Sequence, residues 1–334
     1  MKHYRLLVSV AAVLAFVVVV VGAFVRLSDA GLGCPDWPGC YGKLTPSAAA
    51  PQIARAVNEQ GGTFGPVSLP KAWKEMGHRY LAGTLGLLIL AIALIAWRRR
   101  RELGQSPWLA SAIVLVVALQ GALGMWTVTL LLKPAIVTGH LIGGMTTLAL
   151  LTWLALAQRR YVEAPDARRL RGPAVLGLAV LAVQIVLGGW VSTNYAALAC
   201  PDLPLCHGQL VPPMDFRDAF HVIRDLGMSA DGQLLPLQAL VAIHWTHRMF
   251  ALVAATVLGW AAWRALRVAA LRPLGILVAL ALALQISLGV ANVLLDLPLA
   301  LAAAHNAGAA LLLVSVIVLN FFAFRGAAPR LRRS

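Results

Sequence analysis

The sequence predicts an all-α integral membrane protein with eight transmembrane helices, arranged as two tandem four-helix bundles. Its 334 residues are 60% hydrophobic and only 12% charged, with a mean hydropathy of +0.79. Soluble domains are close to half apolar and about a quarter charged. Two further observations predict the arrangement. Eight apolar runs reach the roughly 20 residues that span a bilayer, and several motifs occur twice at nearly constant spacing.

The eight apolar runs follow one another along the chain. They cover residues 6–26, 78–97, 108–131, 135–157, 173–193, 239–262, 273–294 and 299–323. The first run follows two basic residues, as the apolar part of a cleaved signal peptide does. It is nevertheless long, lacks a clear small-x-small cleavage site and has an internal counterpart in the fifth run. We therefore expect it to be the first transmembrane helix.

The basic residues predict how the helices are oriented. The net charge is +15, and 18 of the 28 lysines and arginines lie on the side that holds the N-terminus and the C-terminal tail. Cytoplasmic loops carry such an excess, so we expect both termini in the cytoplasm and the two long loops, about 27–77 and 194–238, outside. Nucleic acid is not an expected partner, because the basic residues form no stripe with interleaved stacking aromatics.

The same cysteine motif occurs in both long outer loops. CPDWPGC begins at Cys34 and CPDLPLC at Cys200, an offset of 166 residues. ALQGALG at 118–124 likewise matches ALQISLG at 283–289, at an offset of 165. Two copies of one unit that start on the same side of the membrane have parallel topology. We therefore expect a pseudo-twofold axis along the membrane normal between the copies.

This repeat divides the chain into two halves. We expect an N-terminal four-helix bundle over 1–157, a cytoplasmic linker over 158–172 and a C-terminal four-helix bundle over 173–334. Each bundle then has one outer cysteine loop after its first helix. Bundles commonly hold cofactors between facing helices, so each half is a candidate for one cofactor site.

The four cysteines of the chain all belong to the two repeated motifs. Disulfides persist outside the cytoplasm, where the environment is oxidising, and the prolines between the cysteines favour a tight turn. We expect Cys34 to pair with Cys40 and Cys200 with Cys206, although four cysteines also allow two other pairings. Each disulfide could hold a lid over its bundle, or a small strained loop could be redox-active.

Four of the eight histidines recur at equivalent places near the outer ends of even-numbered spans. They are His78 and His140 in the first half, and His247 and His305 in the second. A single histidine at a helix end is usually an interfacial polar residue, but ionisable residues within spans mark functional sites. Two imidazoles from facing helices suit the axial positions of a haem iron. Zinc fits less well, because it wants four ligands together.

The residues around the first histidine of each pair differ between the halves. Glu75 precedes His78 by one turn, where the second half has His244. A carboxylate beside only one of the two sites indicates proton handling in the N-terminal half, although an acidic residue also suits a helix N-terminus. Arg79 and Arg248 follow the histidines, and each could pair with a haem propionate or extend to the membrane interface.

Together these motifs resemble the haem A synthase family of membrane enzymes. The resemblance covers essentially the whole chain. The matching segments are GAFVRLSDAGLGCPDWPGCYGKLTP, Glu75-x-x-His78-Arg79, Gly139-His140, His247-Arg248 and His305-Asn306. Any one of them alone is weak, whereas their occurrence together within eight apolar spans is specific.

The resemblance implies a role for each recurrent histidine. His78 and His140 would flank the substrate haem O in the N-terminal half, with Glu75 as the acidic residue near it. His247 and His305 would ligate a haem b in the C-terminal half. The cysteines of the first outer loop match the family's cysteine pair, although the family varies in its cysteines.

The resemblance also implies a reaction, partners and a location. Members of the family convert haem O to haem A for cytochrome oxidase by oxidising the C8 methyl group to a formyl group, through two hydroxylations and loss of water. In such chemistry the protein supplies position and electrostatics. The expected partners are membrane lipid, a haem O synthase, an electron donor and a second copy of the chain. The implied location is the bacterial cytoplasmic membrane.

Three other functions remain compatible with these residues. A di-haem b-type electron-transfer protein, such as a quinol-linked cytochrome, would use the same four histidines without modifying haem. A disulfide-generating membrane oxidoreductase would depend on the loop cysteines rather than on the histidines. A transporter would share the tandem repeat but would bind no haem, which an absorption spectrum would reveal.

Overall fold

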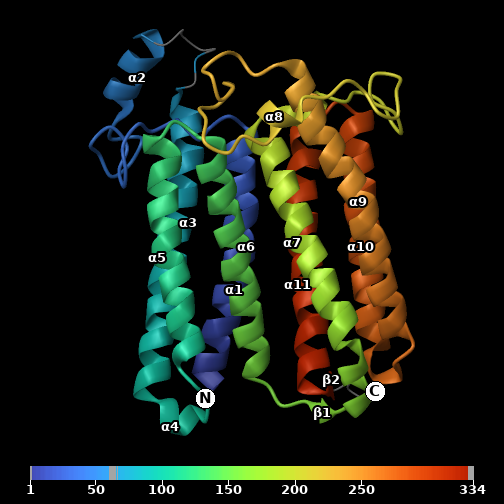
Figure 1. The fold of residues 1–334 in the computed structure, drawn as a ribbon. Coiled ribbons are helices and arrows are strands. Elements are labelled where there is room, and N and C mark those ends of the chain that lie inside the picture. The colour runs from blue at the N-terminus through green and yellow to red at the C-terminus, as the bar shows by residue number, and fades with distance from the viewer. Residues whose placement is uncertain (1, 60–64, 66, 330–334) are drawn as a thin grey trace.

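The computed structural model describes residues 2–59, 65 and 67–329. Within them, eight long helices lie alongside one another (Figure 1), each long and apolar enough to cross a membrane. The predicted all-α integral membrane protein is therefore confirmed. The long helices are α1 Lys2–Leu27, α3 Leu69–Arg98, α5 Trp108–Thr129, α6 Pro134–Ala157, α7 Arg171–Thr193, α9 Leu237–Leu266, α10 Arg272–Leu294 and α11 Leu299–Arg325.

Shorter elements lie at the two ends of this helix layer. At the end with the two long loops are α2 Ala50–Glu59, the 3-10 turn η3 Ala196–Leu198 and α8 Phe216–Ala219. At the other end, with the start of α1, are α4 Arg100–Leu103, β1 Val162–Glu163, η2 Pro165–Leu170, η4 Ala269–Leu271 and β2 Ala327–Ala328. This division agrees with the expected loop positions, while the side that faces the cytoplasm stays a prediction.

Helix α3 begins at Leu69, nine residues before the predicted start of the second span. Ser68 caps it, since its hydroxyl oxygen accepts the N–H of Lys71, and Pro70 occupies the first turn. Both features favour a helix start. The apolar run predicts only the part of a helix within lipid, so it missed this polar extension. Glu75 consequently lies inside a continuous helix rather than before it.

The helices contact one another in the same order in both halves. In the first half, α1 and α5 each contact α3 and α6, and in the second, α7 and α10 each contact α9 and α11. Between the halves, α6 contacts α11, and the first helix of each half contacts the last helix of the other, α1 with α11 and α7 with α6. This order supports two related four-helix units, whose division at 158–172 stays a prediction.

Equivalent positions of the repeat meet at the ends of α1 and α7 that lead into the two long loops. Arg26 Nη2 donates to the carbonyl oxygen of Ser192 at 3.0 Å, and its guanidinium lies 4.1 Å from the centre of the Tyr195 ring. The Tyr195 hydroxyl in turn lies 3.0 Å from the Asp29 carboxylate. Each of these two residue pairs is separated by the repeat offset of 166. The contact therefore lies where a pseudo-twofold axis would pass.

The linker pairs with the segment that follows the last helix of the chain, α11. Val162 and Glu163 of β1 pair with Ala328 and Ala327 of β2 in a two-stranded antiparallel sheet. Within the membrane region, the buried Asn320 amide of α11 donates to the carbonyl oxygen of Ala174 on α7 at 2.9 Å. The segment predicted as a linker is thus folded against the C-terminal half.

Candidate functional site

His78 and His140 face each other from α3 and α6. Their ring centres lie 6.5 Å apart, and the ring planes stand at 87° to each other. Two imidazoles on opposite sides of one metal ion, with metal–nitrogen distances of about 2.0–2.1 Å, have ring centres roughly 6 Å apart. The spacing of this pair therefore fits two axial ligands of one iron.

The ring nitrogens of these histidines also fit ligation. In the part of the chain that the structure describes, the buried Nδ1 atoms of His78, His140 and His305 have no hydrogen-bond partner. Buried polar atoms are nearly always hydrogen-bonded, so an unpartnered imidazole nitrogen is available to a bound group. Histidine is a usual axial ligand of haem iron. The donor set and the spacing of the first pair thus both fit a haem.

A glycine on a neighbouring helix lies against each of the four histidines. A Cβ atom at any of these glycines would lie within about van der Waals contact of the imidazole or closer. The distances from that Cβ to the histidine Cε1 are 2.8 Å for Gly22 and His78, 3.3 Å for Gly124 and His140, 3.0 Å for Gly188 and His247, and 3.1 Å for Gly289 and His305. In each half, the first helix supplies one of these glycines and the third helix supplies the second. The histidines therefore pack against glycines in the same way in both halves.

Glutamines contact the histidines of the second half. Gln184 Nε2 lies 3.1 Å from His247 Nδ1, and Gln285 Nε2 lies 3.3 Å from His305 Nε2. Gln285 has a repeat counterpart in Gln120, whereas the first half has an apolar residue at the position equivalent to Gln184. The sequence interpretation missed these glutamines and the four glycines, although most of them belong to the repeated motifs.

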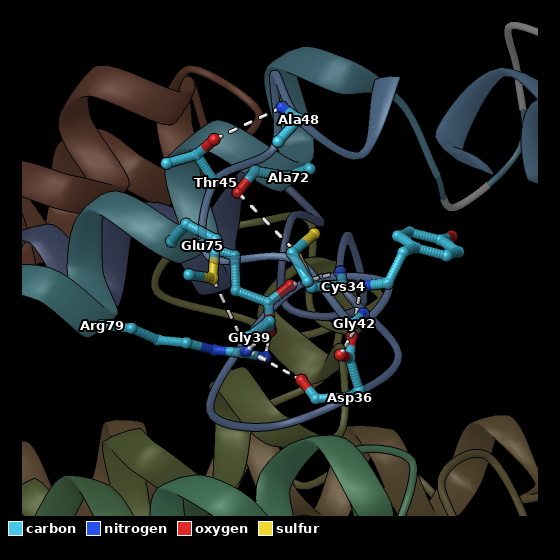
Figure 2. The surroundings of a disulfide bond; sticks show 12 residues. Cys34, Asp36, Gly39, Gly42, Thr45, Ala48, Ala72, Glu75 and Arg79 are labelled. Atoms are coloured by element: carbon cyan, nitrogen blue, oxygen red, sulfur yellow. Dashed lines mark hydrogen bonds and ion pairs between the residues drawn. A yellow bond between two sulfur atoms is a disulfide. The ribbon is translucent and has the colours of Figure 1, made fainter. Parts of the chain in front are cut away.

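Glu75 and Arg79 join α3 to the first cysteine loop (Figure 2). The Cys34 N–H donates to Glu75 Oε2 at 2.9 Å, and Arg79 Nη2 pairs with Glu75 Oε1 at 2.5 Å. Arg79 Nη1 also donates to the carbonyl oxygens of Asp36 and Gly39, at 2.8 and 2.6 Å. Glu75 is only 4% exposed. A buried carboxylate is thus held by an arginine and a loop amide one turn from His78.

The second half repeats this connection without the carboxylate. The Cys200 N–H donates to His244 Nδ1 at 3.3 Å, so His244 takes the place of Glu75 as the acceptor. Arg248 donates to the carbonyl oxygens of Cys200, Asp202 and Leu205, at 3.1, 2.9 and 3.1 Å. Neither arginine side chain extends only toward the membrane–water interface. Both hold the loops, and their pairing with propionates stays a prediction.

Both predicted disulfides are present, Cys34–Cys40 and Cys200–Cys206, and all four cysteines are buried. In each loop an aspartate closes the following turn by accepting two backbone N–H groups. Asp36 accepts from Tyr41 and Gly42 at 2.6 and 2.8 Å, and Asp202 accepts from His207 and Gly208 at 2.7 and 2.8 Å. The N–H groups of Gly208 and His207 hold the pKa of Asp202 below its usual value. These contacts favour a structural role for the loops.

Comparisons with known proteins identify the family. A family model described as cytochrome oxidase assembly protein, COX15-CtaA, matches residues 5–317. A protein of Shewanella oneidensis named heme A synthase is 41% identical over 321 residues, which is 95% of each chain. Proteins of the same name from Caulobacter vibrioides and Rhizorhabdus wittichii are 31% and 30% identical and cover 96% and 92% of this chain and 95% and 90% of their own. The chain therefore belongs to the haem A synthase family.

Proposed function

We propose that this protein oxidises the C8 methyl group of haem O to a formyl group, giving haem A for cytochrome oxidase assembly. Family membership supports the reaction, since the reported relatives are named heme A synthase rather than cytochrome. The structural observation that carries the proposal is the pair His78 and His140, 6.5 Å apart. The buried Glu75 carboxylate lies one helical turn from His78 along α3. Among the residues that the structure describes, this combination of imidazoles and carboxylate belongs to the N-terminal half, since the second half has His244 in place of Glu75.

In this proposal the two halves of the chain bind different haems. Residues 1–157 bind the substrate haem O between His78 and His140, the segment 158–172 connects the halves, and residues 173–334 bind a haem b between His247 and His305. When bound, haem b would supply one-electron transfer between an external donor and the N-terminal half. Equivalent glycines beside all four histidines support two haem sites of one design.

Glu75 would handle protons for the reaction. In this proposal the methyl group becomes a formyl group through two hydroxylations with dioxygen as the oxidant. Each hydroxylation inserts one oxygen atom, takes up two electrons from the donor and two protons, and gives one water. The resulting diol then loses water to leave the formyl group. Glu75 Oε1 pairs with Arg79 and Oε2 accepts the Cys34 N–H, which fixes the carboxylate one turn before His78. A positioned carboxylate can then accept and pass on a proton. His244 in the second half offers no carboxylate for this role.

Arg79 and Arg248 would bind haem propionates in addition to holding the loops. Their donors to the loop carbonyls leave some N–H groups for a carboxylate, because a guanidinium carries five. The buried Nε of Arg248 has no partner among the described residues. Guanidinium–carboxylate pairs are among the stronger hydrogen-bonded contacts. The arginines would thereby link each cysteine loop to the haem beneath it.

Purified protein supplied with haem O, a reductant and dioxygen tests the proposal. Mass spectrometry of the extracted haem should reveal the formyl product, and the His140→Ala variant should give none. Absence of product from the wild-type protein under active electron supply would favour the di-haem electron-transfer function instead. The assay also identifies usable electron donors, and adding a haem O synthase tests whether it delivers the substrate directly.

The glycine beside His247 offers a conservative test of the second haem site. Gly188→Ala is expected to weaken haem b binding about tenfold, because the new methyl would lie 3.0 Å from His247 Cε1 and overpacking costs about 1–3 kcal/mol. Titration of the purified apoprotein with haem measures the effect. Gly259→Ala on α9 is the matched control, since its Cβ would have no neighbour within 4 Å. Equal haem affinities of Gly188→Ala and Gly259→Ala would contradict the packing of His247 against Gly188.

Removal of the first disulfide separates a structural from a redox role. Cys34→Ser with Cys40→Ser is expected to lower the melting temperature, because a short disulfide loop contributes about 2 kcal/mol. Part of the haem O turnover should remain, since Glu75, Arg79 and the Asp36 turn still hold the loop. The equivalent change at Cys200 and Cys206 is the control. Complete loss of turnover at unchanged melting temperature would instead indicate redox chemistry at the cysteines.

A further inference from the structure

A basic pocket lies at the end of the molecule opposite the cysteine loops. It has a volume of about 430 Å³. Its walls come from the start of α1, from α4 and the segment after it, from the end of α6 and the residues that follow it, and from the end of α11. Four arginines line it: Arg5, Arg159, Arg160 and Arg325. The pocket thus joins elements of both halves, and it is distant from the histidines and cysteine loops that the proposed function uses.

The positive charge of this pocket is not neutralised within the part of the chain that the structure describes. None of the four arginines there has an ion-pair partner. Among the described residues that line the pocket, Glu102 is the one acidic residue, and its carboxylate lies 3.8 Å from Arg99 instead. Clustered cations repel one another unless an anion lies among them. The arrangement therefore favours an anionic ligand.

The wall of the pocket is held in place by its own hydrogen bonds. The side-chain amides of Gln105 and Gln158 donate to each other, with nitrogen–oxygen distances of 2.5 and 2.8 Å. The Gln158 amide also donates to the carbonyl oxygen of Leu154, and Gln158 is buried. These bonds fix the end of α6 to the segment before α5. This part of the pocket wall is therefore held in place by side-chain hydrogen bonds.

A smaller pocket of about 200 Å³ adjoins the basic one and shares Arg159 and Arg325 with it. Its other walls include Tyr161 and Phe321, whose rings lie 5.6 Å apart. The Arg325 guanidinium lies 5.5 Å from the Phe321 ring centre. Aromatic rings beside basic residues at the ends of transmembrane helices are typical of the headgroup level of a bilayer. A ligand that occupied both pockets would contact a charged region in one and an apolar region in the other.

We propose that the two pockets bind an anionic phospholipid, with its phosphate group among the four arginines and its glycerol region against the partly exposed Tyr161 ring. Guanidinium groups suit phosphate because their planar N–H pairs match two of its oxygens. Basic pockets between transmembrane helices are known sites for anionic headgroups. Because the pocket opens where the helices end, we assign a membrane lipid rather than a soluble phosphate. The lipid would contact α1 and α6 of one half and α11 of the other.

Lipid binding to the purified, delipidated protein tests this proposal. The dissociation constant for phosphatidylglycerol is measured by native mass spectrometry, with phosphatidylcholine and inorganic phosphate as separate arms. Arg159→Gln with Arg325→Gln should weaken phosphatidylglycerol binding roughly 30-fold, because each basic residue near an anionic lipid contributes about fivefold. Arg98→Gln with Arg100→Gln removes the same charge at the same end, outside the pocket, and should leave binding unchanged. Helix content from circular dichroism verifies folding, and Arg159→Gln alone should show about a fivefold loss.

Three outcomes would overturn the proposal. Equal losses in the pocket variant and the control variant would mean that only the general surface charge attracts lipid. Equal affinity for phosphatidylcholine would remove the role of the anionic group. Inorganic phosphate that binds as tightly as the lipid would assign the arginines to a soluble anion. Tight phosphatidylglycerol binding that depends on Arg159 and Arg325 supports the site, whatever the result of the haem O assay.

Discussion

Replacing His247 or His305 by alanine is expected to remove the b-type signal from the reduced-minus-oxidised difference spectrum of the purified protein. Each histidine would supply one axial ligand of haem b, and each is seated against a glycine of a neighbouring helix. Loss of partners behind a metal ligand already costs about 10- to 100-fold in affinity, so loss of the ligand itself should cost at least that. We expect less than about a tenth of the signal to remain.

The matched control for these variants is another histidine of the same half. His221 is exposed in the second long loop, and its backbone carbonyl, not its imidazole, accepts the Arg224 N–H. His221→Ala should therefore retain the full b-type signal. If His247→Ala retained it as well, the assignment of the axial ligands in the C-terminal half would be wrong.

Replacing Glu75 should lower turnover strongly and leave haem b in place. Glu75→Ala removes a buried carboxylate that pairs with Arg79 and accepts the Cys34 N–H. General acid–base catalysis contributes about 10²- to 10⁴-fold, so we expect haem A formation to fall at least about 100-fold. The b-type signal should persist, because Glu75 lies in the other half from His247. Haem A formation and the difference spectrum are measured on the same preparation.

Two further variants separate proton handling by Glu75 from its contact with the loop. Glu75→Gln keeps an oxygen that can accept the Cys34 N–H but cannot exchange a proton, so it should restore stability without restoring turnover. His244→Ala removes the equivalent acceptor for Cys200 and should cost stability, about 1–3 kcal/mol, rather than turnover. Wild-type turnover in Glu75→Gln would show that the carboxylate is purely structural.

Most of the fold could be predicted because lipid imposes a strong pattern on sequence. All eight apolar runs are helices, and seven of them begin within about a turn of the predicted residue. The exception is α3, whose polar first turns project beyond the apolar run. Hydropathy indicates which residues lie in lipid. The start of α3 is instead set by Ser68, which caps the helix backbone, so hydropathy alone could not predict it.

The site could be predicted only in part, for a related reason. The repeat identified the histidines and cysteines by residue type and spacing, and the expected disulfides are present. The repeated segments 118–124 and 283–289 also contained Gly124 and Gly289, but a glycine has no chemistry that reveals which side chain packs against it. Arg79 bonds to carbonyl oxygens more than 35 residues away in the chain. Backbone acceptors of this kind are invisible in a sequence, so the anchoring role of the arginine emerged only from the structure.

The division of the two haems between the halves is tested most directly by identifying the haems that copurify with the protein. Wild-type protein and the His140→Ala variant are purified from cells that make haem O, and the extracted haems are separated and identified by mass spectrometry. The wild-type protein should contain haem b together with haem O or haem A. His140→Ala should contain haem b in the wild-type amount and no haem O or haem A. Loss of haem b from His140→Ala, with haem O or haem A retained, would contradict the assignment of the two sites.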